Sequence, residues 1–87
     1  HAEASARAAE AAARVVAPER IRRNAPPAMG AEDFSYMLER RPGCMIKLGQ
    51  RGPGGEGGVP LHHPDYDFND EAAPLGASIF AAIVEQE

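Results

Sequence analysis

The chain is 87 residues long, so it can form one small domain, which buries only roughly 60% of its unfolded surface on folding. Its residues are 44% apolar and 25% charged, the balance of an ordinary soluble protein rather than of a disordered or membrane-spanning one. The net charge of -4 excludes the basic surface that nucleic acid binding requires, and no apolar run reaches the ~20 residues that span a bilayer. We therefore expect neither nucleic acid nor a membrane as a partner.

Cysteine usage and the first residues indicate the compartment. The single cysteine, Cys44, cannot form an internal disulfide, and its apolar neighbours suggest a small buried hydrophobic residue rather than a reactive thiol. The first residues are rich in alanine and glutamate and lack the basic start and apolar stretch of a signal peptide. These features predict a cytoplasmic protein, and a start at His1 rather than Met permits the interpretation that the chain is a fragment.

An alanine-rich segment opens the chain and predicts a helix over residues 2–17. Small apolar residues recur at three- and four-residue steps on one face of it: Ala6, Ala9, Ala13 and Val16. The helix should end at residue 17, because Pro18 disfavours helical dihedral angles in the residue before it. Its inward face carries little more than methyl groups, so its stability must come from packing onto a larger body.

Two short strands and a second helix are expected in the middle of the chain. Residues 19–24 have one apolar residue among charged ones and predict at most a short strand, whereas residues 44–48 read as a mostly buried strand. Between them, residues 31–38 place Phe34 and other apolar residues at helical spacing, after two acids that suit the positive end of a helix dipole.

The last third of the chain contains a glycine-rich loop and a third helix. Residues 49–58 are mostly glycine and predict a mobile loop, which is not a phosphate-binding loop because the lysine that ends such a motif is missing. The final helix should begin near Asn69 or Asp70 and bury apolar residues at steps of four, namely Leu75, Ile79 and Ile83, with Phe80 beside them. Pro74 falls within its first turns, which leaves the starting residue open by about a turn.

The segment with chemical content runs from Leu61 to Asp70 and reads LHHPDYDFND. It places two imidazoles and three carboxylates on a loop, and neutral imidazole is a common ligand of zinc and related ions. Adjacent residues of an extended segment point in opposite directions, so His62 and His63 do not readily bind one ion together. By spacing alone, either histidine can equally be a surface or capping residue.

Three stretches read together are more specific: MGAEDFSY over residues 29–36, IKLG over residues 46–49, and LHHPDYDFNDE over residues 61–71 leading to Pro74-Leu75-Gly76. In this order and spacing they resemble the carboxy-terminal end of the metal-dependent amidohydrolases, which include hippurate hydrolase, N-acyl-amino-acid amidohydrolase (aminoacylase) and the plant auxin-conjugate hydrolases. The resemblance covers essentially the whole chain, residues 1–87.

The resemblance implies a fold and a domain assignment. The fold is α/β, a partial piece of a metallopeptidase-like catalytic domain in which about three helices pack on a sheet and two short strands of that sheet are present. The amino-terminal part of the domain and the smaller inserted domain are absent from residues 1–87. Two short strands alone would leave an open edge and a bare face, so a fragment is expected to associate with another copy through the exposed sheet surface.

The resemblance also implies a mechanism: hydrolysis of the amide bond of N-acyl amino acids by a metal-activated water, in a centre of one or two zinc or manganese ions. The Leu-His-x-Pro element places the last protein ligand of that centre on His62, with His63 in the variable position. Gly30 and Asp33 would lie near the substrate pocket. No catalytic residue is assigned: Cys44 is outside the family's metal motif, and acids at helix starts, such as Glu32 or Glu71, are more often dipole partners than general bases. The chain alone is expected to be inactive.

Two alternatives stay open. One is a small non-catalytic binding or scaffold module that uses Phe34, Tyr36 and the final helix as a contact surface. The other is a dipeptidase or desuccinylase of the same metallopeptidase clan, which the Gly30-to-Phe34 stretch favours less than an aminoacylase. If the chain is a fragment, we call the longer protein that contains it the parent. No motif of residues 1–87 indicates which acyl group or amino acid the parent acts on, which metal it binds, or its oligomeric state.

Overall fold

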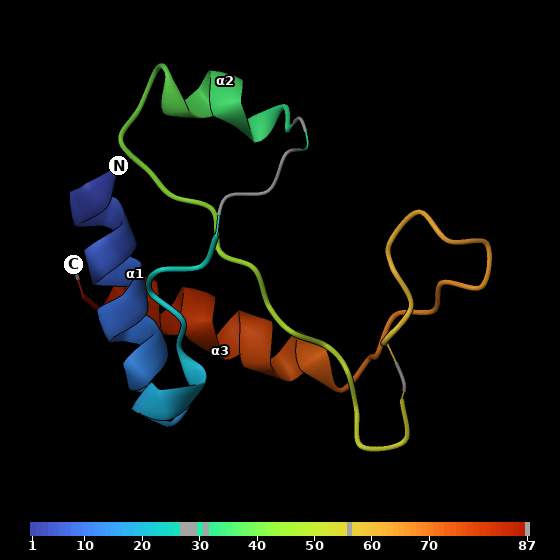
Figure 1. The fold of residues 1–87 in the computed structure, drawn as a ribbon. Coiled ribbons are helices and arrows are strands. Elements are labelled where there is room, and N and C mark those ends of the chain that lie inside the picture. Colours follow the sequence, from blue (N-terminus) through green and yellow to red (C-terminus); the bar gives the residue numbers. More distant parts are fainter. Residues whose placement is uncertain (27–29, 31, 56, 87) are drawn as a thin grey trace.

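A computed structural model describes residues 1–26, 30, 32–55 and 57–86. Within them the chain forms three α-helices and one short 3-10 helix (Figure 1): α1 (Ala2–Ala13), the 3-10 helix η1 (Pro18–Arg20), α2 (Phe34–Leu38) and α3 (Ala72–Glu85). The helices α1 and α3 cross one another at one side of the molecule, and long connecting segments make up much of the rest. No helix among the described residues is long and apolar enough to cross a membrane.

The first helix is shorter than its sequence predicts. It ends at Ala13, and the amide groups of Arg14 and Val15 bond to carbonyls only three residues back, so the last turn tightens before it unwinds. Pro18 does have the predicted effect on Ala17, which is extended, with φ -60° and ψ 138°. The difference of four residues therefore reflects a frayed end rather than a wrong element type.

The third helix settles the position of Pro74. Because α3 begins at Ala72, Pro74 is its third residue and lies in the first turn, where a backbone N–H has no partner within the helix. The N-cap residue is Glu71, which makes no side-chain capping bond, so the predicted cap at Asn69 or Asp70 was wrong. The side chain of Asn69 instead accepts a hydrogen bond from the amide of Glu71 at 3.1 Å, just before the helix. On the predicted core face Ile79 is buried and Leu75 is half-buried.

Alanine dominates the packing of α1 against α3. The buried side chains of these helices are Ala8, Ala11 and Ala12 on α1, and Ala72, Ile79 and Ala82 on α3. Two polar contacts join the helices at the end of α3: Arg14 bonds to Glu85 at 3.1 Å, and the Gln86 amide donates to the Arg7 carbonyl at 3.0 Å. Small side chains let the helices approach closely, but each buried methyl group contributes little free energy, so this contact is weak.

The expected α/β fold with helices packed on a sheet is wrong for the residues that the structure describes, because none of them forms a strand. Residues 44–48 have no regular secondary structure and pair with no other described segment; instead they contact both helices. The Cys44 thiol lies 3.6 Å from the Ala4 carbonyl, and Leu48 packs beside Gly76. Residues 19–24 begin in η1 and continue irregularly. A strand needs a hydrogen-bonded neighbour, and the described chain gives neither segment one.

The chain exposes much more surface than a folded protein of its mass. Its accessible surface is 7375 Å², whereas a monomer of 9.2 kDa is expected to expose about 4,900 Å². The radius of gyration is 14.1 Å, against about 12 Å for a compact domain of this length. Many large apolar side chains are exposed: Tyr36, Met37, Met45, Ile46, Leu48, Leu61, Phe68, Phe80 and Val84. Such a surface is typical of a segment that packs onto a larger body.

Candidate metal-ligand loop

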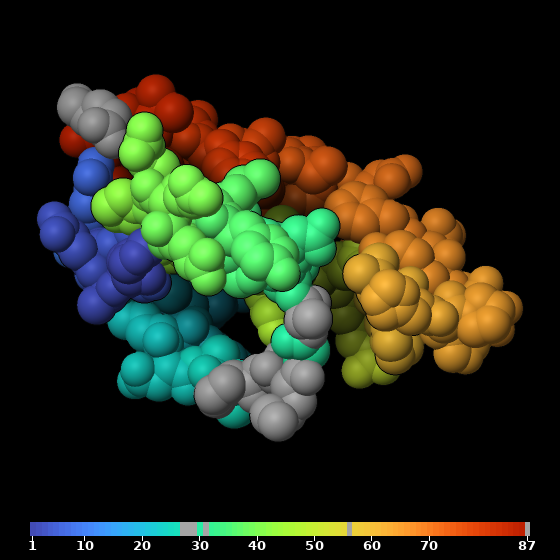
Figure 2. All heavy atoms as spheres, turned by 90° about the horizontal axis from the view of Figure 1, so that it is seen from above, coloured from blue at the N-terminus to red at the C-terminus, as the bar shows by residue number. Residues whose placement is uncertain are grey.

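The two histidines lie on a loop that projects from the helices, seen at one side of Figures 1 and 2 in yellow and orange. Both imidazoles are exposed. Nδ1 of His63 accepts a hydrogen bond from the Asp65 amide at 3.0 Å and lies 4.0 Å from the Asp65 carboxylate. His62 forms no hydrogen bond or ion pair with the described residues, so both of its ring nitrogens are open to a ligand from outside them.

The two ends of this loop are joined by a network of side-chain hydrogen bonds that we call the neck, formed by Gln50, Tyr66 and Asn69. The Gln50 amide donates to the Tyr66 hydroxyl at 3.0 Å, and its oxygen accepts from the Asn69 backbone amide at 3.0 Å. The Asn69 side chain donates to the Gln50 carbonyl at 2.9 Å. All three residues are half-buried, which strengthens these bonds relative to bonds in open water.

Glycine is required at one point beside the neck. Gly57 has φ +70°, and a Cβ there would lie 2.6 Å from the Gln50 carbonyl oxygen and 3.1 Å from the Asn69 Cβ. Gly55 also has a positive φ, of 91°, but open space surrounds the position of its Cβ. The glycine-rich segment is therefore packed against the neck at Gly57, where both the backbone angle and the contact exclude a larger residue.

Gly30 and Asp33 lie at an open depression next to α2, with a volume of about 440 Å³. Its other lining residues are Glu32, Ser35 and Tyr36. The Glu32 carboxylate accepts a hydrogen bond from the Phe34 amide at 3.3 Å, so it supports the first turn of α2. Part of the predicted motif, residues 29 and 31, lies outside the described residues.

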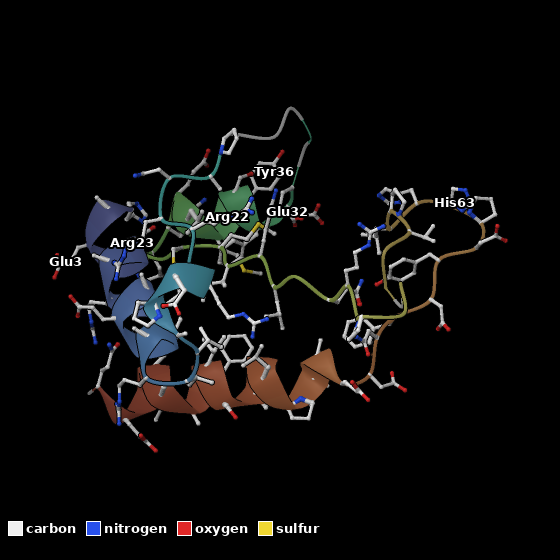
Figure 3. The ribbon with its side chains drawn as sticks, turned by 60° about the horizontal axis from the view of Figure 1, so that its bottom comes forward. Glu3, Arg22, Arg23, Glu32, Tyr36 and His63 are labelled. Carbon is white, nitrogen blue, oxygen red and sulfur yellow. The ribbon has the colours of Figure 1, made fainter. Side chains whose placement is uncertain are left out.

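The structure does not bring the histidine loop and this depression together. Figure 3 shows Glu32 and Tyr36 side by side and His63 well apart from them, and the same separation between α2 and the loop appears in Figure 1. Across the described ranges, no three His, Cys, Asp or Glu side chains are close enough to hold one metal ion. Cys44 is half-buried and lies on the extended segment beside α1, away from the loop. A metal site with three or more such ligands that includes His62 must therefore take at least part of them from outside the described residues.

Residues 1–86 match the sequence model of a family described as peptidase family M20/M25/M40. The chain belongs to this family. The match covers both the histidine loop and the segment around α2, so the two separate regions are parts of one family sequence. Membership confirms the resemblance to metal-dependent amidohydrolases, because members of the M20/M25/M40 family are generally metal-dependent.

Curated relatives show the same relationship. An "IAA-amino acid hydrolase ILR1-like 2" of Arabidopsis thaliana is 40% identical over 62 residues, which are 71% of this chain and 14% of the relative. A "Probable hydrolase" of Synechocystis sp. is 47% identical over 49 residues, 56% of this chain and 12% of the relative. An "N-acetyldiaminopimelate deacetylase" of Streptococcus suis is 42% identical over 50 residues, 58% of this chain and 12% of the relative.

The alignments are short relative to these proteins: the parts that match the chain are 12–14% of the relatives' length. No solved structure matches the chain significantly.

The sequence did not single out the neck. Gln50 follows the apolar segment 44–48 without any motif, and Asn69 stands out only as part of the LHHPDYDFND segment and as a possible helix cap. A pair of amide side chains that flanks a glycine-rich loop is a signal for such a closure, but it is a weak one, because exposed amides are common at both ends of loops.

Proposed function

We propose that this chain is the carboxy-terminal part of the catalytic domain of a metal-dependent amidohydrolase, that it supplies the metal ligand His62, and that it is inactive alone. The observation that carries the proposal is the family match over residues 1–86, which includes the histidine loop. The printed names of the relatives support the reaction class, because an IAA-amino acid hydrolase and an N-acetyldiaminopimelate deacetylase both separate an acyl group from an amino acid. N-acyl amino acids, including hippurate-like ones, are the proposed substrates.

His62 fits the role of a ligand chemically. Its imidazole is exposed and without a partner among the described residues, whereas Nδ1 of His63 is already engaged by the Asp65 amide. Zinc and manganese both accept imidazole nitrogen, so either ion suits the proposal, in a centre of one or two metals. The chemistry that a divalent ion supplies in such hydrolases is the activation of water and the stabilisation of negative charge on the amide oxygen.

The proposed substrate contacts are Gly30 and Asp33, at the depression beside α2. Among the described residues no atom lies within 4 Å of the position that a Cβ of Gly30 would take, so the described chain leaves room for a ligand next to the backbone there. Asp33 is exposed, and as a carboxylate it can accept hydrogen bonds from an amide N–H or bind a cationic group of the substrate. Because these residues lie apart from His62, the remaining residues of the parent must complete the pocket.

A second candidate function is a non-catalytic protein-binding module. The observation in its favour is the exposure of Tyr36 and Met37 on α2, at 71% and 64%, and of Phe80 on α3, at 69%. Exposed aromatic and methionine side chains are typical of protein contacts. The two candidates differ in what must surround the chain: the enzyme needs further ligands from a longer parent, whereas the module needs none.

The deciding experiment measures hydrolysis of a panel of N-acyl amino acids by the intact parent protein with added zinc or manganese. His62→Ala is compared with His63→Ala, the neighbouring exposed histidine. We expect His62→Ala to lose turnover by a factor of at least ~10³, because it removes a metal ligand, and His63→Ala to keep it within about tenfold. A parent that hydrolyses none of the panel, or a His62→Ala variant as active as the wild type, contradicts the proposal and favours the binding module.

A further inference from the structure

We infer that the neck of Gln50, Tyr66 and Asn69 is a positioning device that holds the His62 loop in the conformation in which it binds metal. The inference rests on the proposed ligand role of His62. It assigns a function to Gln50, which lies outside the three stretches that carry the family resemblance and whose side chain joins the two ends of the loop.

The need for such a device follows from the composition of the loop. Residues 51–60 are mostly glycine and proline, and backbone hydrogen bonds such as those from Gly58 to Gly55 and from His63 to Pro60 form short turns there. Short turns shape the chain locally but do not fix where the loop lies. Glycine leaves the backbone with a large conformational entropy, so an unanchored loop would spend little time in one ligand geometry.

The neck provides long-range connections. Its three hydrogen bonds join residues 16 and 19 positions apart in the chain. The Asn69 side chain is engaged at both ends, because its nitrogen donates to the Gln50 carbonyl and its oxygen accepts from the Glu71 amide at the start of α3. The loop is thereby tied to the helix. Gly57 packs against Gln50 and Asn69, so the glycine-rich side of the loop is held there as well.

The loop that carries His62 is therefore connected to helix α3 through Gln50 and Asn69, and not through direct contacts of His62 itself. Metal affinity depends on ligands held in place by supporting hydrogen bonds, and loss of such support typically weakens binding by about 10- to 100-fold. Neither Gln50 nor Asn69 contacts the imidazole in the described structure, so both are positioning residues and not ligands.

The test uses the intact parent protein and measures its zinc affinity by competition with a chromophoric chelator, alongside its melting temperature. Gln50→Leu removes both side-chain bonds of Gln50, and Asn69→Asp replaces the donor that faces the Gln50 carbonyl with an oxygen. We expect each variant to fold and to bind zinc about tenfold more weakly than the wild type, at the lower end of the range for lost supporting bonds.

Gln86→Leu is the matched control, because it makes the same change at another half-buried glutamine that joins two elements, α1 and α3. It should lower the melting temperature as Gln50→Leu does, yet leave the zinc affinity within about twofold. Gln50→Glu keeps the oxygen that accepts from Asn69, and the Tyr66 hydroxyl can donate to its carboxylate, so it should restore the affinity to within about threefold.

The possible outcomes distinguish failure of the positioning role of the neck from failure of the ligand role of His62. If Gln50→Leu and Asn69→Asp bind zinc as the wild type does while His62→Ala does not, the neck has no positioning role and the proposed function stands. If His62→Ala itself binds zinc with wild-type affinity, the proposed function fails. If Gln50→Leu and Asn69→Asp do not fold, Gln50→Glu and Tyr66→Phe decide. Tyr66→Phe removes one bond of the three, so a folded Tyr66→Phe protein should lose about threefold in affinity, and unchanged affinity there would overturn the inference.

Discussion

Replacing Phe80 with alanine tests whether the outer face of α3 is covered in the intact parent protein. Phe80 leaves 69% of its surface exposed in this structure. If the rest of the parent covers that surface, about 140 Å² of apolar area leaves water, taking ~200 Å² for a phenylalanine. At ~25 cal/mol per Å² this burial contributes about 3.5 kcal/mol to the free energy of unfolding of the parent. Alanine keeps a small part of that area, so we expect Phe80→Ala to destabilise the parent by about 3 kcal/mol.

The assay is urea-induced unfolding of the intact parent, followed by circular dichroism and by fluorescence. Ile79→Ala serves as the internal standard, since Ile79 is next in sequence and is only 7% exposed within this chain. It should cost about 2 kcal/mol whether or not the outer face is covered. A cost below ~0.5 kcal/mol for Phe80→Ala beside a normal cost for Ile79→Ala would show that the face stays in water. That result would refute the assignment of α3 to the interior of a larger domain.

Three further predictions concern the glycine-rich loop, the contact between Arg14 and Glu85, and the self-association of the isolated chain. Gly57→Ala should destabilise the parent by about 2 kcal/mol more than Gly55→Ala in the same unfolding assay. Both glycines have positive φ, but only at Gly57 would a Cβ also lie 2.6 Å from the Gln50 carbonyl oxygen. Equal losses of stability would contradict the packing of Gly57 against the neck. A double-mutant cycle on Arg14 and Glu85 should give a coupling energy below ~0.5 kcal/mol, because their side chains are 53% and 63% exposed. A coupling energy above ~1.5 kcal/mol would contradict the interpretation of this ion pair as a weak surface contact. The isolated chain should sediment as oligomers at micromolar concentrations, through the exposed apolar side of α3 in place of the sheet surface that the sequence predicted; a single monomeric species at all concentrations would disprove this.

The helices could be predicted from the sequence because their signals are local. Alanine content predicted α1 and four-residue spacing predicted α3, and the effect of Pro18 on Ala17 was confirmed. The predicted inner face of the first helix was wrong: its buried residues are Ala8, Ala11 and Ala12 rather than Ala6, Ala9, Ala13 and Val16. The exact ends were less predictable, since fraying at Arg14 depends on the balance of a few weak hydrogen bonds. Phe80 was expected beside the buried face and is exposed, because α3 has apolar residues on all sides and one neighbouring helix covers only one of them.

The predicted sheet failed because a strand is not a local structure. Residues 44–48 have the composition of a buried strand, but among the described residues they have no hydrogen-bonded partner, and a segment becomes a strand only beside one. The neck was missed for the same reason. Nothing near Gln50 in the sequence shows that Asn69, 19 positions away, will bond to both its carbonyl and its side chain. The ligand role of His62 came from the resemblance and stays a prediction.

Metal content of the purified parent tests the central claim most directly. The wild type, His62→Ala and His63→Ala proteins are loaded with zinc or with manganese, dialysed against buffer without chelator, and analysed by inductively coupled plasma mass spectrometry. We expect His62→Ala to lose at least one bound ion per chain relative to the wild type and His63→Ala to lose none, because Nδ1 of His63 is engaged by the Asp65 amide and His62 is open. Equal metal content in all three proteins would contradict the placement of a metal ligand on this loop.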